Sequence, residues 1–292
     1  RVSEIGLTLK RITDNFTNVQ LLVTGSSSFE LQSNLNEPLT GRKYEYHLYP
    51  ISTAELYDSQ GLLPVKQMFE SRLIYGSYPD IINHTDEAKE LLMNIANSYL
   101  YKDLLAMNEI RRPILLEKLL IALALQVSSE VSYNEVAQTI GTDNKTVEKY
   151  IDLLEKCYVI FRLNAFNRNL RTELKKSKKI YFYDNGIRNA VIQNFAPLSL
   201  RQDTGALWEN FFISERIKAN HYNGNYAKSF FWRTTQQQEI DYIEEADGNF
   251  TAFEMKWNPN KRPITFPSPF LNNYPVKETV VITPENYLEW VM

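Results

Sequence analysis

The chain has 292 residues, of which 43% are hydrophobic and 23% are charged, and its formal net charge is −3. This length and composition indicate a globular protein of two or three units, each with its own core. One cysteine excludes an internal disulfide framework, three scattered histidines leave no plausible zinc site, and the longest apolar run is too short to cross a bilayer.

The first predicted unit, residues 1–62, alternates helices and strands. Apolar residues at helical spacing predict a helix over 2–16, and a short apolar run predicts a buried strand over 20–24. A second strand is expected over 44–48, and a capping box that begins at Ser52 predicts the next helix. The sequence contains no G-x-x-x-x-G-K-[ST], so the chain has no phosphate-binding loop of its own.

The second predicted unit, residues 63–183, is mainly helical. Residues 132–140 and 144–154 have the pattern of two short helices joined by a glycine-containing turn, which is a helix-turn-helix. A strand over 158–163 and a return strand over 179–183 follow. Seven basic residues and a single acid lie on this connection; the basic residues are Arg162, Arg168, Arg171, Lys175, Lys176, Lys178 and Lys179.

A basic hairpin after a helix-turn-helix is the layout of a winged helix. The second helix would present Asn144, Lys145, Glu148 and Lys149 to DNA. The alternative is a module for protein–protein or interdomain packing, because Glu148 and Asp152 on the same helix weaken its attraction for phosphate. The residues predicted to contact nucleic acid are Lys145, Lys149, Arg168, Arg171, Lys175 and Lys176.

The third predicted unit, residues 184–292, combines a helix with a meander of strands. Glu209 lies near the start of the helix. The expected elements are a helix over 204–219, strands over 229–233, 239–244 and 250–257, and a further strand over 275–283 before a last short helix.

An Asp-Gly pair at 247–248 is one of the strongest short signals for a hairpin. A loop centred on this pair places Asp241 opposite Glu254 and Glu239 opposite Lys256. Opposed Cβ atoms lie about 4.5–5.5 Å apart, and two carboxylates near a protein surface repel each other by about 4 kcal/mol at about 4 Å. The repulsion is relieved if the adjacent lysine, a hard divalent cation, or both lie between them. The alternative is a solvent-facing hairpin with a cross-strand ion pair between Glu239 and Lys256.

These residues carry a family resemblance. A helix with an early glutamate, a hairpin with an aspartate and an E-x-K on the next strand resemble the PD-(D/E)xK nuclease core. The resemblance implies that Glu209, Asp241, Glu254 and Lys256 form the catalytic site. It implies further that Asp241, Glu254 and Glu209 hold Mg²⁺ or Mn²⁺, and that Lys256 orients or helps to deprotonate the attacking water and stabilises charge on the phosphate.

Further motifs resemble a widespread prokaryotic family of AAA-type ATPases with a C-terminal domain of unknown function. They are Thr24-Gly25-Ser26-Ser27-Ser28, Leu39-Thr40-Gly41-Arg42, Leu48-Tyr49-Pro50-Ile51-Ser52, Gly76-Ser77-Tyr78-Pro79, Asn185-Gly186 and Trp208-Glu209-Asn210. In that family a P-loop ATPase domain precedes a winged helix and a nuclease-like fold.

By this resemblance the chain begins just after the Walker B strand, and it is expected to be a fragment of a longer protein. Thr24 and Ser26 would belong to the sensor segment near the γ-phosphate, and Arg42 would be a functional arginine. The chain alone would then not hydrolyse ATP, which would bind to the intact protein. Without the resemblance, the segment at Thr24 is simply a polar turn.

The sequence therefore predicts an α/β and α+β multidomain protein: 1–62 as the remnant of a P-loop AAA-type α/β domain, 63–183 as a helical winged-helix domain, and 184–292 as a restriction-endonuclease-like α/β/α domain. The expected function is DNA processing, with DNA as partner, no membrane, a cytoplasmic location and any oligomer formed through the ATPase part. The alternative is a non-catalytic regulatory or protein-interaction module of a STAND-like signalling ATPase.

Overall fold

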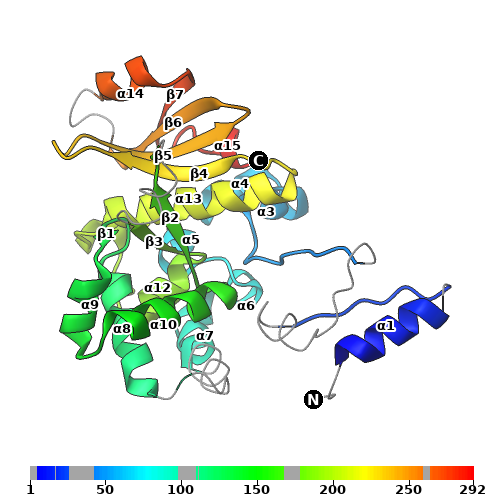
Figure 1. Cartoon of the computed structure of the whole chain (residues 1–292). Coiled ribbons are helices and arrows are strands. Elements are labelled where there is room, and N and C mark those ends of the chain that lie inside the picture. Colours follow the sequence, from blue (N-terminus) through cyan, green and yellow to red (C-terminus); the bar gives the residue numbers. More distant parts are fainter. Residues whose placement is uncertain are drawn as a thin grey trace.

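A computed structural model describes residues 5–16, 18–25, 43–97, 110, 112–167, 178–258 and 264–292 (Figure 1). Its helices are α1 (Ile5–Asn15), α3 (Thr53–Gln60), α4 (Leu62–Gln67), α5 (Phe69–Tyr75), α6 (Pro79–Asn83), α7 (Ala88–Ile95), α8 (Pro113–Leu125), α9 (Tyr133–Ile140), α10 (Asn144–Lys156), α12 (Asn185–Val191), α13 (Thr204–Tyr222), α14 (Ser268–Asn273) and α15 (Leu288–Val291), with 3₁₀ turns at Thr85–Glu87 and Leu198–Leu200. Its strands are β1 (Glu130–Val131), β2 (Ile160–Ala165), β3 (Lys178–Phe182), β4 (Lys228–Arg233), β5 (Glu239–Ala246), β6 (Asn249–Met255) and β7 (Val276–Ile282).

The strands form one seven-stranded mixed sheet in the order β1-β3-β2-β4-β5-β6-β7. β1, β3 and β2 are antiparallel neighbours, as are β4, β5 and β6, whereas β7 runs parallel to β6. A short parallel pairing joins the two groups, with Asn164 beside Phe230 and Ala165 beside Phe231. The sheet therefore continues from the helix-turn-helix region into the C-terminal region without a break.

Helices cover both faces of the β4–β7 part of the sheet, with α13 on one face and α14 on the other (Figure 1). Successive residues of a strand point to opposite faces. Phe231 accordingly belongs to the main core with Phe212 of α13, while Phe230 and Trp232 pack in a second cluster with Phe270 of α14. Apolar side chains therefore pack against helices on both faces of this part, as in a layered α/β fold.

Most predicted elements are confirmed, including the meander β4-β5-β6, the late strand β7 and the capping box at Ser52. The strands expected over 20–24 and 44–48 are wrong, because neither segment pairs with a strand in the described part of the chain. Leu22 and Leu48 are each 90% exposed. A short apolar run forms a strand only where a neighbour supplies the ladder hydrogen bonds.

Among the described residues, none of the helices has the length and apolar character needed to cross a membrane.

Candidate functional site

The predicted hairpin is formed by β5 and β6. Asp247 and Gly248 have φ values of 51° and 79°, as a two-residue type I′ loop requires. The ladder pairs run from Ala246–Asn249 to Tyr242–Phe253, so the next residues along the two strands are Asp241 and Glu254. The register expected from the Asp-Gly pair is confirmed.

Lys256 lies between the two carboxylates of this hairpin. Its Nζ is 2.7 Å from Oε2 of Glu254 and 3.7 Å from Oδ2 of Asp241. The same oxygen of Asp241 accepts a hydrogen bond of 3.0 Å from the backbone N–H of Met255, which fixes the carboxylate at the end of the ladder. The adjacent lysine is thus one positive charge that relieves the repulsion.

The alternative ion pair between Glu239 and Lys256 is not the arrangement found. Oε1 of Glu239 lies 2.6 Å from Nζ of Lys179 and its Oε2 lies 3.4 Å from Arg233. Glu239 is therefore directed toward β3 and β4 rather than toward the end of β6.

Glu209 reaches the same cluster from the second turn of α13. Its Oε1 accepts a hydrogen bond of 2.6 Å from the hydroxyl of Tyr181 and lies 3.2 Å from Nζ of Lys179. Lys179 and Tyr181 alternate on β3 and so point to the same side of the sheet. β3 therefore contributes a cation and a hydroxyl to the candidate site.

The electrostatics show that these groups form one cluster. Burial, reinforced by the charge of Asp241, raises the pKa of Glu254 to about 7, although Lys256 opposes the shift. Burial also raises the pKa of Glu209 to about 7, with Lys179 opposing and Asp241 adding to the shift. Asp241 thus influences carboxylates on both α13 and β6.

The cluster carries more negative than positive charge. When all are ionised, four carboxylates face two ammonium groups and leave two negative charges uncompensated; the members are Glu209, Glu239, Asp241, Glu254, Lys179 and Lys256. Arg233 and Glu130 form an ion pair at the rim and add nothing to the balance.

Asp241 and Glu254 fit a hard divalent cation. Their oxygens are the ligands that Mg²⁺ and Mn²⁺ prefer, and their side chains are only 17% and 12% exposed. Burial and the neighbouring charge of Asp241 raise the pKa of Glu254, and a bound cation would oppose that shift. Within the described ranges, no three His, Cys, Asp or Glu side chains are grouped closely enough to hold an ion together. Glu209, predicted as a third ligand, is directed instead toward Lys179 and Tyr181.

Several other predicted site residues lie elsewhere. Lys145 and Lys149 are exposed on α10, and Thr24 is exposed on a segment without regular structure. Outside the described residues lie Ser26, Arg42, Arg168, Arg171, Lys175 and Lys176.

The basic connection is less available than its composition predicts. Arg162 pairs with Asp152 and Glu155 of α10, Nζ of Lys178 lies 5.1 Å from the ring centre of Tyr133, and Lys179 is buried in the cluster described above. Three of the seven basic residues counted in the sequence are therefore engaged by other residues of the protein, and one of them, Lys179, is buried.

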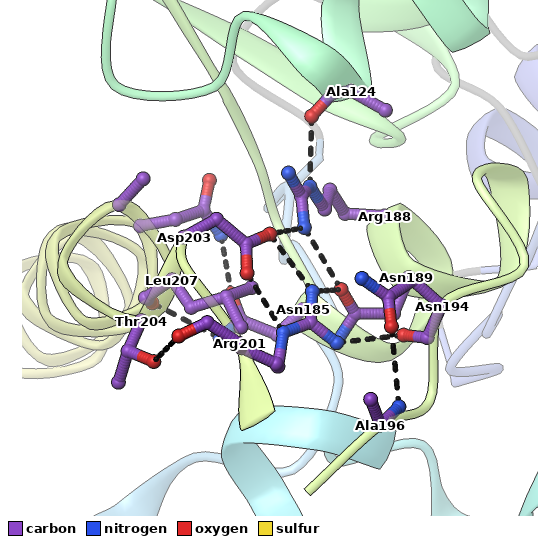
Figure 2. A network of polar contacts seen from close by, with 12 residues as sticks. Ala124, Asn185, Arg188, Asn189, Asn194, Ala196, Arg201, Asp203, Thr204 and Leu207 are labelled. Carbon is purple, nitrogen blue, oxygen red and sulfur yellow. Dashed lines mark hydrogen bonds and ion pairs between the residues drawn. The ribbon is translucent and has the colours of Figure 1, made fainter. Parts of the chain in front are cut away.

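A buried polar network holds the start of α13 and thereby the place of Glu209. Asp203, just before α13, accepts hydrogen bonds from Arg188 and Arg201, as Figure 2 shows. Arg188 also donates to the carbonyl of Ala124 at the end of α8. The network therefore joins α8, α12 and α13.

Three of the motifs that carried the wider resemblance, at 76–79, 185–186 and 208–210, meet at a second buried junction. The backbone N–H of Ser77 donates to Asp184, and Asn210 bonds both to the backbone of Phe182 and to Asn185. Gly76 has φ 75°, and a Cβ there would lie 1.9 Å from Asp184. Apart from Glu209, these motif residues are structural.

Sequence reasoning missed Lys179, Tyr181 and Glu239 as members of the cluster. The alternation of Lys179 and Tyr181 on a strand could be read from the sequence. Their closeness to Glu209 could not, because it depends on the packing of α13 against β3.

Comparison with known families gives three matches along the chain. Residues 1–57 match an AAA domain, 66–198 match a domain of unknown function (DUF8612), and 204–289 match another domain of unknown function (DUF4143). The first and third matches support an AAA-type ATPase-like family.

The relatives found are uncharacterized proteins. One from Haemophilus influenzae is 27% identical over 186 residues, covering 60% of this chain and 46% of that protein. One from Methanocaldococcus jannaschii is 23% identical over 254 residues, covering 80% of this chain and 54% of that protein. One from Mycobacterium tuberculosis is 28% identical over 124 residues, covering 42% of this chain and 27% of that protein. The chain thus spans about half the length of the first and second of these relatives and less of the third, and no solved structure matches it.

Proposed function

We propose that this chain is the DNA-processing part of an AAA-type ATP-binding protein, with a metal-dependent nuclease-type site at Asp241, Glu254, Lys256 and Glu209. One observation carries the proposal: α13, β5 and β6 bring these four side chains into one cluster, in the chain order that the nuclease resemblance requires. When all its carboxylates are ionised, the cluster has two more negative than positive charges, which supports a site for a divalent cation.

Each residue has a role that its surroundings support. Lys256 is 36% exposed and lies against both carboxylates, so its ammonium can orient a water or stabilise charge that develops on a phosphate oxygen. Glu254 is 12% exposed and lies beside Lys256, so its carboxylate oxygens are placed to act as metal ligands. Asp241 holds the end of the β5–β6 hairpin together by accepting a hydrogen bond from Met255, and it faces both Glu254 and Lys256.

Asp241 and Glu254 would hold the divalent ion. The resemblance implies Glu209 as a third ligand, but its carboxylate contacts Lys179 and Tyr181 instead. A bound Mg²⁺ or Mn²⁺ would polarise the phosphoryl oxygens of a phosphodiester and neutralise the charge around them.

The DNA contact would be made by α8, α9, α10 and the β2–β3 hairpin acting as a winged helix. The antiparallel order β1-β3-β2 beside three helices supports this arrangement. Lys145 and Lys149 would contact phosphates from α10, and Arg168, Arg171, Lys175 and Lys176 would do so from the hairpin.

In a longer protein, Thr24, Ser26 and Arg42 would face ATP, whose binding and hydrolysis would control the C-terminal part. The match of residues 1–57 to an AAA domain supports this assignment.

Incubating the chain with Mg²⁺ or Mn²⁺ and linear or supercoiled DNA tests the proposal. We expect cleavage by the native chain and its loss in Asp241→Ala, because the substitution removes a central carboxylate. Glu245→Gln is the matched control, since Glu245 lies on the same strand but pairs with Lys228 away from the cluster. The absence of cleavage, metal binding and DNA binding together would favour a non-catalytic regulatory module instead.

The hairpin contact has a separate test. Replacing Lys175 and Lys176 with glutamine removes two phosphate contacts, so the slope of log K against log salt should become shallower by about two units. Measuring DNA affinity at several salt concentrations checks this. An unchanged slope would reject these contacts without bearing on the cluster.

A further inference from the structure

Lys179 is the most confined cation of the candidate site. Its side chain is 2% exposed, and its Nζ lies 2.6 Å from Glu239, 3.2 Å from Glu209 and 5.4 Å from the ring centre of Phe231. Burial alone would lower the pKa of Lys179, but the charges of Glu209, Asp241 and Glu239 raise it above its ordinary value. The ammonium is thus a permanent charge enclosed by carboxylates and an aromatic ring.

Lys256 at the other end of the cluster differs in this respect. It is 36% exposed, and its long side chain can turn toward solvent or toward a bound phosphate. If it does so, Asp241 and Glu254 lose their positive neighbour. The side chain of Lys179 cannot turn toward solvent in the same way, because carboxylates, a tyrosine and a phenylalanine lie around it.

We propose that Lys179 occupies a fixed cation position on the Glu209–Glu239 side, so that the site binds a single divalent ion, on the Asp241–Glu254 side. This inference rests on the metal-dependent function proposed above. Glu209 then serves as a partner of Lys179 rather than as a ligand of the ion, and β3 supplies a positioning residue to a site that otherwise belongs to α13, β5 and β6.

Calorimetric titration of the full chain with Mn²⁺ tests the inference. We expect one bound ion in the native chain and two in Lys179→Met, because the vacated position is lined by carboxylates. Adding Glu209→Gln to Lys179→Met should restore a stoichiometry of one. Lys228→Met is the control, since Lys228 is 73% exposed on the same sheet and pairs with Glu245.

The outcomes separate the two proposals. No binding by the native chain overturns the metal-dependent function and this inference with it. Two ions in the native chain, or one ion with unchanged affinity in Lys179→Met, overturns only the inference. If Lys179→Met fails to fold, Glu209→Gln alone decides: retained binding of one Mn²⁺ with an affinity within about threefold supports the inference, and loss of the ion makes Glu209 a ligand and rejects it.

Discussion

Replacing Glu215 with alanine is expected to lower the free energy of unfolding by about 3–5 kcal/mol, the cost of removing one partner from a buried ion pair. Its Oε1 lies 2.7 Å from Nζ of Lys218 and its Oε2 lies 3.4 Å from Arg72, and all three side chains are at most 2% exposed. Oε2 also accepts hydrogen bonds from Thr53 at the start of α3. The substitution leaves two buried cations without their anion. Urea unfolding measures the loss, and Glu245→Ala should stay within about 0.5 kcal/mol of the native chain.

The ion pairs of Glu215 with Lys218 and Arg72 also predict how the free energy of unfolding depends on pH. Burial alone would raise the pKa of Glu215, but the charges of Lys218 and Arg72 lower it to about 2. Because the folded-state pKa is below the ordinary value near 4.5, the contribution is fully present above pH 4.5 and is lost as the pH falls toward 2. Between these pH values the native chain should lose more stability than Glu215→Gln. Equal losses of stability in the native chain and in Glu215→Gln would show that ionised Glu215 contributes nothing to stability in this pH range.

Replacing Lys256 with methionine is expected to slow metal-dependent DNA cleavage by at least about a hundredfold, as removal of a group that stabilises transition-state charge does elsewhere. Methionine keeps the length of the side chain but removes the ammonium from between Asp241 and Glu254. DNA affinity should change little, because one charge is lost from a large contact surface. Single-turnover cleavage with saturating protein separates the chemical step from binding.

Lys277→Met is the matched control for this variant. Lys277 lies on β7, next to β6 in the same sheet, and is exposed. Its replacement should leave the rate unchanged. A rate for Lys256→Met within about threefold of the native rate would remove Lys256 from the catalytic site.

The local parts of the site could be predicted from the sequence. The Asp-Gly pair at 247–248 determines the loop, and the loop determines which residues of β5 and β6 are opposed. Helical spacing likewise predicted α13 and the place of Glu209 on it. These features depend on residues close together in the chain.

The remaining parts depend on contacts between distant segments. Lys179 reaches Glu239 because β2 pairs with β4. This pairing consists of two residue pairs, and no local sequence pattern predicts it. The expected strands over 20–24 and 44–48 failed for the related reason that a strand is defined by its neighbours. Sequence patterns predict which face of an element is apolar, but not which element lies beside it.

The continuous sheet has a consequence for dividing this protein into fragments. A shortened chain that began at residue 184, where the sequence places a boundary, would lack β2 and leave β4 as an open edge beside apolar residues such as Phe230 and Phe231. Open edges of this kind pair with other chains and aggregate. The fragment would also lose Lys179 and Tyr181, which hold Glu209. A soluble fragment with an intact cluster therefore has to begin before β2. The β2–β3 hairpin and the charged cluster have to be kept in the same fragment.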